Sequence, residues 1–259
     1  MKRALIPAVL FMASVFGADN VMAAIATDVD TVATVPGDGG LCSDVTSSSF
    51  STAQANELLL VFISSNDTGG ATVVTGAGLS WWLVKRFTNA AGNGLVEVWS
   101  AYATLQLNNV TVTARRYCGT GGFYDMFMDV VSFTGAREVI GAKNTAASGG
   151  GLPTITLTTT GNNSWVWAVG EDWTYENTHT AGASQTITQK WDSAHPTGNE
   201  SVQWVQKQNS TTTSPGTSVT INDTAPAGDA FIMIEVEILA SAPGPVKIRS
   251  GRIRSGQIR

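Results

Sequence analysis

Cysteine and histidine are scarce: the 259-residue chain contains two cysteines, Cys42 and Cys118, and two histidines, His179 and His195. So few histidines leave little material for a histidine-dependent triad or a multi-histidine metal site. Two cysteines without nearby histidines are too few for a structural zinc site. The sequence also lacks a Gly-x-Ser-x-Gly elbow, an HExxH helix, a Walker loop and a dinucleotide fingerprint. It therefore predicts no catalytic residue, no metal site and no cofactor.

Calcium is the one ion that the composition leaves open. Carboxylates gather around Asp28 and Asp30 and again at Glu171 and Asp172, and calcium binds to such oxygen-rich loops. No spacing matches an EF-hand loop.

Long hydrophobic runs are limited to residues 4–17, which follow Lys2 and Arg3 and precede small residues at 21–24. This pattern is typical of a secretory signal peptide over 1–24, and the run is too short to favour a membrane span. A buried N-terminal helix is the alternative. We expect the mature protein to be secreted, periplasmic or on the cell surface. In an oxidising compartment, a disulfide between Cys42 and Cys118 is expected, with two free thiols as the alternative.

Basic residues are few within 25–241, which carries 8 Lys and Arg against 19 Asp and Glu, a net charge of −11. Binding to nucleic acid needs a basic surface, so we expect no nucleic-acid partner. The last residues, 242–259, contain five basic side chains in a near-repeat of Ile-Arg-Ser-Gly and predict a basic, flexible tail. A cationic arm that touches an acidic polymer is the alternative.

A helical hydrophobic period is missing after the signal, whereas period-two alternation between Gly and Asn turns recurs. Residues 25–33 predict an edge strand, and the apolar run 57–64 predicts a central strand buried on both faces. About a dozen short strands indicate an all-β domain over 25–241, a two-sheet antiparallel β-sandwich of the jelly-roll or lectin kind. In the last strand, 231–239, Glu235 and Glu237 are expected to point outward.

After a turn at 161–163, a strand with Trp165, Trp167 and Val169 on one face leads into residues 171–173, which we interpret as an exposed corner. Aromatic side chains beside carboxylates suit the faces and hydroxyls of a sugar, so the candidate ligand-binding residues are Glu171, Asp172, Trp173, Tyr175 and Trp191. The alternative is an aromatic corner that pins a long loop. The remaining tryptophans, Trp82 among them, are mostly expected in the core.

A resemblance supports the same fold. The run from Ala55 to Ile238 resembles an uncharacterised β-sandwich module of secreted bacterial proteins, found beside immunoglobulin-like repeats in exported multidomain proteins. The resembling blocks are ANELLLVFISS, VTGAGLSWWLVKRFTNAAG, VEVWSAYA, VVSFTGA, PTITLTTTGNNSWVWAVGEDW, SQTITQKW, WVQKQ, VTINDTAPAGD and EVEI. It implies fold and location and no activity.

These observations together predict an exported, non-catalytic module that binds an extracellular polysaccharide or another cell-surface polymer, or serves as an adhesive or structural surface domain. The alternative is a sandwich-fold glycoside hydrolase or polysaccharide lyase. Glu235 and Glu237, on one face of a strand, are the carboxylate pair that a hydrolase could use if they lined a groove.

Overall fold

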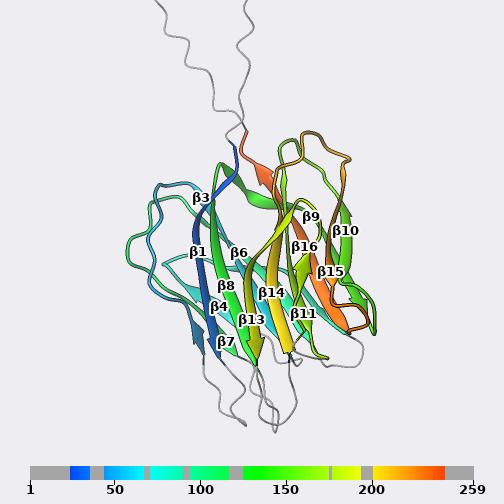
Figure 1. Cartoon of the computed structure of the whole chain (residues 1–259). Coiled ribbons are helices and arrows are strands. Elements are labelled where there is room, and N and C mark those ends of the chain that lie inside the picture. The colour runs from blue at the N-terminus through cyan, green and yellow to red at the C-terminus, as the bar shows by residue number, and fades with distance from the viewer. Residues whose placement is uncertain are drawn as a thin grey trace, which may run out of the picture. The chain divides into compact units, whose positions relative to one another are not determined.

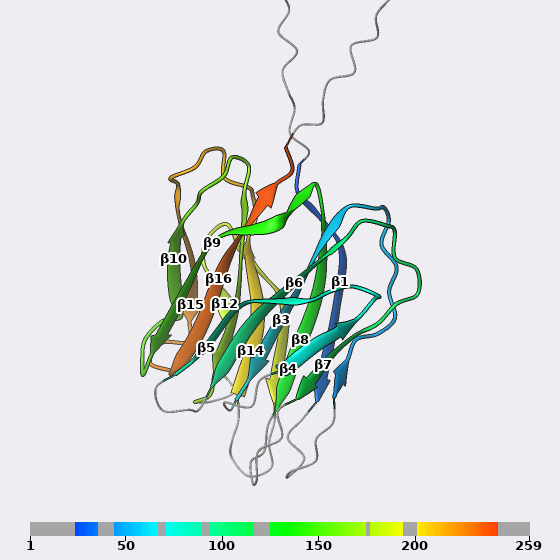
Figure 2. The same ribbon diagram turned by 180° about the vertical axis from the view of Figure 1, so that it is seen from behind.

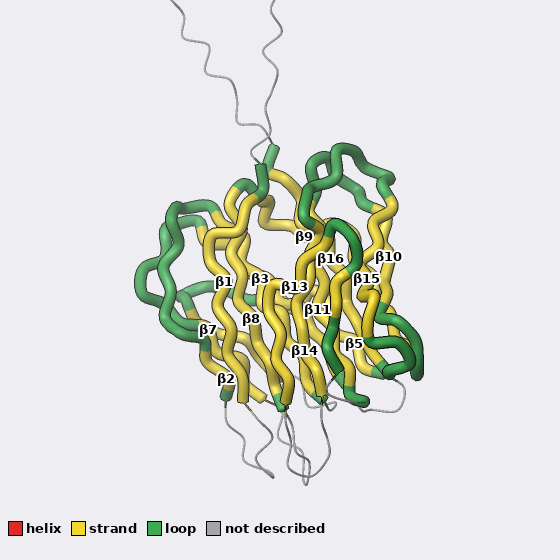
Figure 3. The backbone as a smooth tube through the Cα atoms, viewed as in Figure 1, coloured by secondary structure: helices red, strands yellow, loops and turns green. Residues whose placement is uncertain are grey.

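The described part of the computed structural model comprises residues 24–35, 44–66, 71–89, 94–116, 125–174, 177–193 and 201–242. Its elements are sixteen β-strands without a helix, and strands make up 65% of these residues (Figure 3). The first eight are β1 Ala26–Val35, β2 Val45–Thr46, β3 Glu57–Ser65, β4 Ala71–Gly76, β5 Trp82–Thr88, β6 Leu95–Ala103, β7 Val112–Arg116 and β8 Met126–Thr134. The second eight are β9 Ala136–Ser148, β10 Thr154–Thr158, β11 Trp165–Asp172, β12 Thr180–Ala181, β13 Gln185–Ser193, β14 Ser201–Gln208, β15 Ser218–Ala225 and β16 Phe231–Ala240.

Two five-stranded antiparallel sheets face each other in the middle of the molecule. Their strand orders are β1-β8-β3-β6-β5 and β13-β14-β11-β16-β9. Between them lies a shared core of aliphatic and aromatic side chains, in which Trp167 stacks on Phe62 with ring centroids 6.0 Å apart. Because both inner sheets are covered on both sides, β3, β11 and β16 are buried along almost their whole length.

A three-stranded sheet covers the outer face of each inner sheet, with orders β2-β7-β4 and β10-β15-β12 (Figures 1 and 2). The first outer sheet encloses a second core with one face of β3, β6 and β8. The other encloses a third core with one face of β11, β14 and β16. The fold is therefore four layers of sheet around three cores.

The sixteen strands form two structural repeats, β1–β8 and β9–β16. Adding eight to each strand number of the first inner sheet gives the second inner sheet in the same order, and the same holds for the outer sheets. Within each repeat, the order 1-8-3-6 beside 2-7-4 is that of a jelly roll, except that the fifth strand pairs with the sixth. The all-β sandwich prediction is confirmed, and the sandwich is present twice.

Local irregularities recur at equivalent positions of the two repeats. Asn56 and Asn163, just before β3 and β11, both have positive φ angles, of 63° and 53°. The β5–β6 ladder shifts register at Val84, and the β13–β14 ladder shifts register at the equivalent residue, Thr188. The equivalence therefore extends to individual residues.

A single residue, Gly135, connects the repeats, since β8 ends at Thr134 and β9 begins at Ala136. Its φ of +67° is a conformation that glycine adopts without strain. The two inner sheets pack with reciprocal contacts: β6 packs on β11 while its equivalent β14 packs on β3, and β3 packs on its own equivalent β11. Such reciprocity is the mark of a two-fold, self-complementary interface.

The expected positions of β1 at a sheet edge and of β3 at a sheet centre are confirmed. The expected exposure of Glu235 and Glu237 is wrong, because β16 lies between two cores and both side chains are fully buried. The single domain over 25–241 stays a prediction. Cys42, Cys118, most of the signal segment and the tail residues 243–259 lie outside the described residues.

Candidate functional site

The predicted binding residues do not form an exposed corner. Glu171 and Asp172 are fully buried, and Trp173 and Trp191 are half-buried against the shared core. Tyr175 lies outside the described residues. The exposure that the sequence suggested for Glu171 and Asp172 is therefore wrong.

Glu171 instead connects the two repeats. Its Oε2 atom accepts a hydrogen bond of 3.0 Å from the backbone N–H of Leu95, the first residue of β6. Gly94 leaves the space for this contact, since a Cβ atom there would lie 3.0 Å from the same oxygen. This carboxylate therefore holds the start of β6 against the end of β11.

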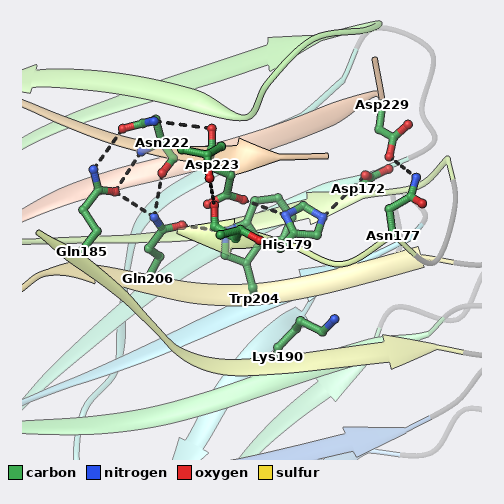
Figure 4. A network of polar contacts seen from close by, with 12 residues as sticks. Asp172, Asn177, His179, Gln185, Lys190, Trp204, Gln206, Asn222, Asp223 and Asp229 are labelled. Atoms are coloured by element: carbon green, nitrogen blue, oxygen red, sulfur yellow. Dashed lines mark hydrogen bonds and ion pairs between the residues drawn. The ribbon is translucent and has the colours of Figure 1, made fainter. Parts of the chain in front are cut away.

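Asp172 belongs to a buried polar network around His179 (Figure 4). The Nδ1 atom of His179 lies 2.7 Å from Oδ2 of Asp223, its Nε2 atom lies 3.6 Å from Oδ2 of Asp172, and all three side chains are inaccessible. The imidazole also packs on the Trp204 ring, with centroids 4.1 Å apart. Burial acts to lower the pKa of His179, but the two carboxylates outweigh it and raise that pKa.

Amides extend this network on the side away from Asp172. Gln206 donates 2.8 Å to Oε1 of Gln185 and 3.0 Å to the carbonyl of Asn222, and the Asn222 N–H donates 2.9 Å to the same Gln185 oxygen. The network joins β11, β13, β14 and β15 through His179, which immediately precedes β12. Because its acid and base groups are sealed from solvent, it serves the structure of the second repeat.

Glu237 is buried but fully hydrogen-bonded. Its carboxylate accepts bonds from the backbone of Ala142, Thr160 and Gly161 and from the hydroxyls of Thr160 and Ser164, at 2.6–2.9 Å. Burial acts to raise the pKa of Glu237, and these bonds lower it below its ordinary value.

Glu235 shares the face of Glu237 but has no hydrogen-bond partner among the described residues. Burial alone raises its pKa to about 9. Both side chains lie beneath the outer sheet that contains β10 and β15, so neither lines the groove that a glycosidase pair would need.

An open aromatic hollow lies at the junction of the repeats, on the opposite edge of the molecule from β1 and β13. It has a volume of about 300 Å³. We call it the Trp82 hollow; its lining residues are Gly78, Leu79, Ser80, Trp82, Ser100, Ala101, Tyr102, Thr104 and Glu138. Trp82 is 70% exposed, which is high for a side chain of this size.

Local sequence explains why Trp82 is exposed while its neighbour is not. Successive residues of an extended chain point to opposite faces. Trp81 packs on the second core and donates its indole N–H to the Gly76 carbonyl at 3.3 Å, so Trp82 points to the other face. There the edge strand β5 has no further strand beside it in the described sheet. The expectation that Trp82 is core is wrong.

Tyr102 and Glu138 complete the polar part of the hollow. Burial raises the pKa of the Tyr102 hydroxyl, and the negative charge of Glu138 raises it further. Tyr102 therefore remains a neutral hydrogen-bond donor beside an exposed carboxylate. Leu83, Leu105 and Val139 add exposed apolar area nearby in sequence, at 43%, 76% and 65% exposure.

The acidic excess of the chain lies largely in the interior. Ten of the acidic side chains in the described ranges are buried: Glu57, Glu97, Asp125, Asp129, Glu171, Asp172, Asp223, Asp229, Glu235 and Glu237. The surface is therefore less negative than the composition suggests. No group of three or more His, Cys, Asp or Glu side chains placed to hold a metal occurs within the described ranges.

No family model, curated protein or solved structure matches the chain. Among the residues that the structure describes, no helix could cross a membrane. The function therefore has to be inferred from the site itself.

Proposed function

We propose that the protein is an exported, non-catalytic β-sandwich module that binds an extracellular carbohydrate at the Trp82 hollow. The observation that carries this proposal is the indole of Trp82, which is 70% exposed over an open hollow lined by hydroxyls, Tyr102 and Glu138. An exposed aromatic ring offers an apolar face to a sugar ring, and adjacent polar groups fix its orientation through hydrogen bonds.

The size and charge of the hollow narrow the ligand class. A volume of about 300 Å³ is at the lower end for small-molecule sites and suits one or two sugar units of a longer chain. The exposed Glu138 carboxylate accepts hydrogen bonds from sugar hydroxyls and repels polyanions. A neutral polysaccharide therefore fits better than a uronic acid polymer. Export rests on the sequence pattern of residues 1–24.

The test is retention of the purified mature protein on a panel of neutral and acidic polysaccharides, with released reducing sugar measured in the same samples. Replacing Trp82 with alanine should weaken binding to the retained glycan about tenfold, because truncating an interfacial aromatic anchor costs about 1–2 kcal/mol. The matched control is Leu152→Ala, which removes another exposed apolar side chain, 42% accessible, on the loop after β9.

Equal binding by both variants would overturn the assignment to this hollow. Loss of binding only after replacement of Trp191 would show that the ligand binds at the residues predicted from the sequence and not at the Trp82 hollow. Release of reducing sugar by the unmodified protein would instead identify the glycoside hydrolase or lyase.

A further inference from the structure

Each repeat has a corner where its first strand bulges beside its eighth strand. In the first repeat the β1–β8 ladder shifts register between Thr27 and Asp30, and in the second the β9–β16 ladder shifts between Val236 and Ile238. The segment that leads into β3 or β11 closes the corner. The two corners are equivalent residue by residue: Asp28 with Gly141, Val29 with Ala142, Ala53 with Thr160, Gln54 with Gly161, Glu57 with Ser164 and Ser132 with Glu237.

In the second repeat, one carboxylate satisfies the whole corner. Glu237 accepts the N–H groups of Ala142, Thr160 and Gly161 and the hydroxyl of Ser164. Position 141 is glycine because a Cβ atom there would lie 2.3 Å from Oε2 of Glu237. Both carboxylate oxygens have donors, so this corner needs no further ligand.

In the first repeat, oxygen atoms from three different side chains accept the equivalent N–H groups in place of a single long carboxylate. The bonds are Val29 N–H to Ser132 Oγ at 3.1 Å, Ala53 N–H to Asp28 Oδ2 at 2.6 Å and Gln54 N–H to Glu57 Oε1 at 3.2 Å. The shorter Ser132 leaves the room that Asp28 occupies. Two carboxylates thus stand where the second repeat has one.

This substitution leaves a buried oxygen without a partner. Glu57 is fully buried, and its Oε2 atom has no hydrogen-bond partner among the described residues. Burial raises the pKa of the Glu57 carboxyl, the nearby Ser132 hydroxyl opposes that rise, and the negative charge of Asp28 adds to it. Two facing carboxylates, one of them with an unpaired buried oxygen, would be stabilised by a positive charge between them.

We propose that the corner formed by Asp28, Glu57 and Ser132 binds a calcium ion. The donors are carboxylate and hydroxyl oxygens only, the set that a hard cation prefers, and calcium tolerates irregular geometry. Asp28 is exposed, so water can supply the remaining ligands. The ion would connect the bulge of β1 to the start of β3, the connection that Glu237 alone provides in the second repeat.

The test is thermal unfolding of the purified mature protein in EDTA and in calcium. Extracellular calcium sites have dissociation constants of about 1 mM, so about 10 mM calcium should raise the melting temperature by about 3–6 °C. The rise should disappear in Asp28→Asn and in Glu57→Gln, and magnesium should give a smaller rise. Titration calorimetry should detect one site in the unmodified protein.

The matched control is Asp192→Asn on β13, which removes an exposed carboxylate paired with Lys190 at 2.9 Å. It should retain the full response to calcium. An equal response in Asp28→Asn and the unmodified protein would overturn the proposal. An unmodified protein whose melting temperature does not respond to calcium would also overturn it. If Glu57→Gln then raises the melting temperature in EDTA, a proton shared between the two carboxyl groups satisfies the corner. If Asp28→Asn fails to fold, Glu57→Gln and the calorimetric stoichiometry decide.

Discussion

Replacing Glu235 with glutamine should stabilise the protein by an amount that depends on pH. The glutamine amide has nearly the shape of the carboxyl group but does not ionise. Glu235 is fully buried beside Met233 on the face of β16 that turns to the third core, and nothing among the described residues bonds to it. Its ionised form is therefore strongly disfavoured in the folded protein.

The size of the effect follows from the two pKa values. The Glu235 carboxyl has an ordinary pKa of 4.5, and burial raises it to about 9 in the folded protein. Because the folded-state pKa is the higher one, the free energy of unfolding is greatest below the ordinary pKa and falls as pH rises toward 9. Each pH unit in that window costs about 1.4 kcal/mol, so the loss at pH 7 is about 3 kcal/mol.

The assay is urea unfolding followed by tryptophan fluorescence at about pH 5, 6, 7 and 8. Trp165 and Trp167 lie in the shared core and report on its disruption. Glu235→Gln and the unmodified protein should have similar stabilities at about pH 5. Their difference should then grow by about 1.4 kcal/mol for each pH unit. All other titrating groups are common to both proteins, so the difference isolates Glu235.

A constant difference between the two curves would refute the reasoning, because it would mean that Glu235 does not change its ionisation on unfolding. A difference that grows in the opposite direction would mean that Glu235 is stabilised as a carboxylate by an interaction with the charged form. Either result would exclude a neutral, buried acid at this position.

Two further variants test the neighbouring carboxylate and the buried imidazole. Glu237→Gln should lower the free energy of unfolding by about 2–3 kcal/mol at pH 7, because the amide cannot accept all the hydrogen bonds of the carboxylate. The pKa of Glu237 is lowered in the folded protein, so the loss should shrink as pH falls below 4.5 toward that lowered pKa; urea unfolding at acid pH checks this, and a loss independent of pH would contradict it. His179→Gln should cost about 1–3 kcal/mol at pH 6 and less at pH 9, because a raised histidine pKa contributes stability below its ordinary value of 6.5 and loses it as pH rises through the folded-state value. An equal loss at both pH values would show that His179 stays neutral between Asp172 and Asp223.

The sandwich class was predictable because strands leave a local signal. The continuous apolar run of β3 indicated burial on both faces, and the polar alternation of β1 indicated an edge. The presence of two structural repeats was not predictable in this way. Equivalent residues such as Leu58 and Trp165, or Phe62 and Val169, share only apolar character, so the repeats have little sequence similarity to detect.

The buried acids show where alternation misleads. In a sandwich with one solvent-facing side, polar residues at every second position point outward. β16 follows that pattern at Glu235 and Glu237, but an outer sheet covers the side on which they lie. The deciding contact comes from β10 and β15, strands distant in sequence, and no local pattern contains it. The same limit applies to Trp82, whose exposure depends on β5 being the last strand of its sheet.

The one-residue link at Gly135 has a consequence for how the two halves hold together. A short tether keeps the inner sheets at an effective concentration in the millimolar range or above, whatever the dilution of the protein. The interface between them therefore does not need the affinity of a free dimer. Polar side chains such as Asp129 and Lys207 can therefore lie between the inner sheets without separating the two repeats. Cutting the chain at Gly135 would make the association of the two repeats depend on protein concentration.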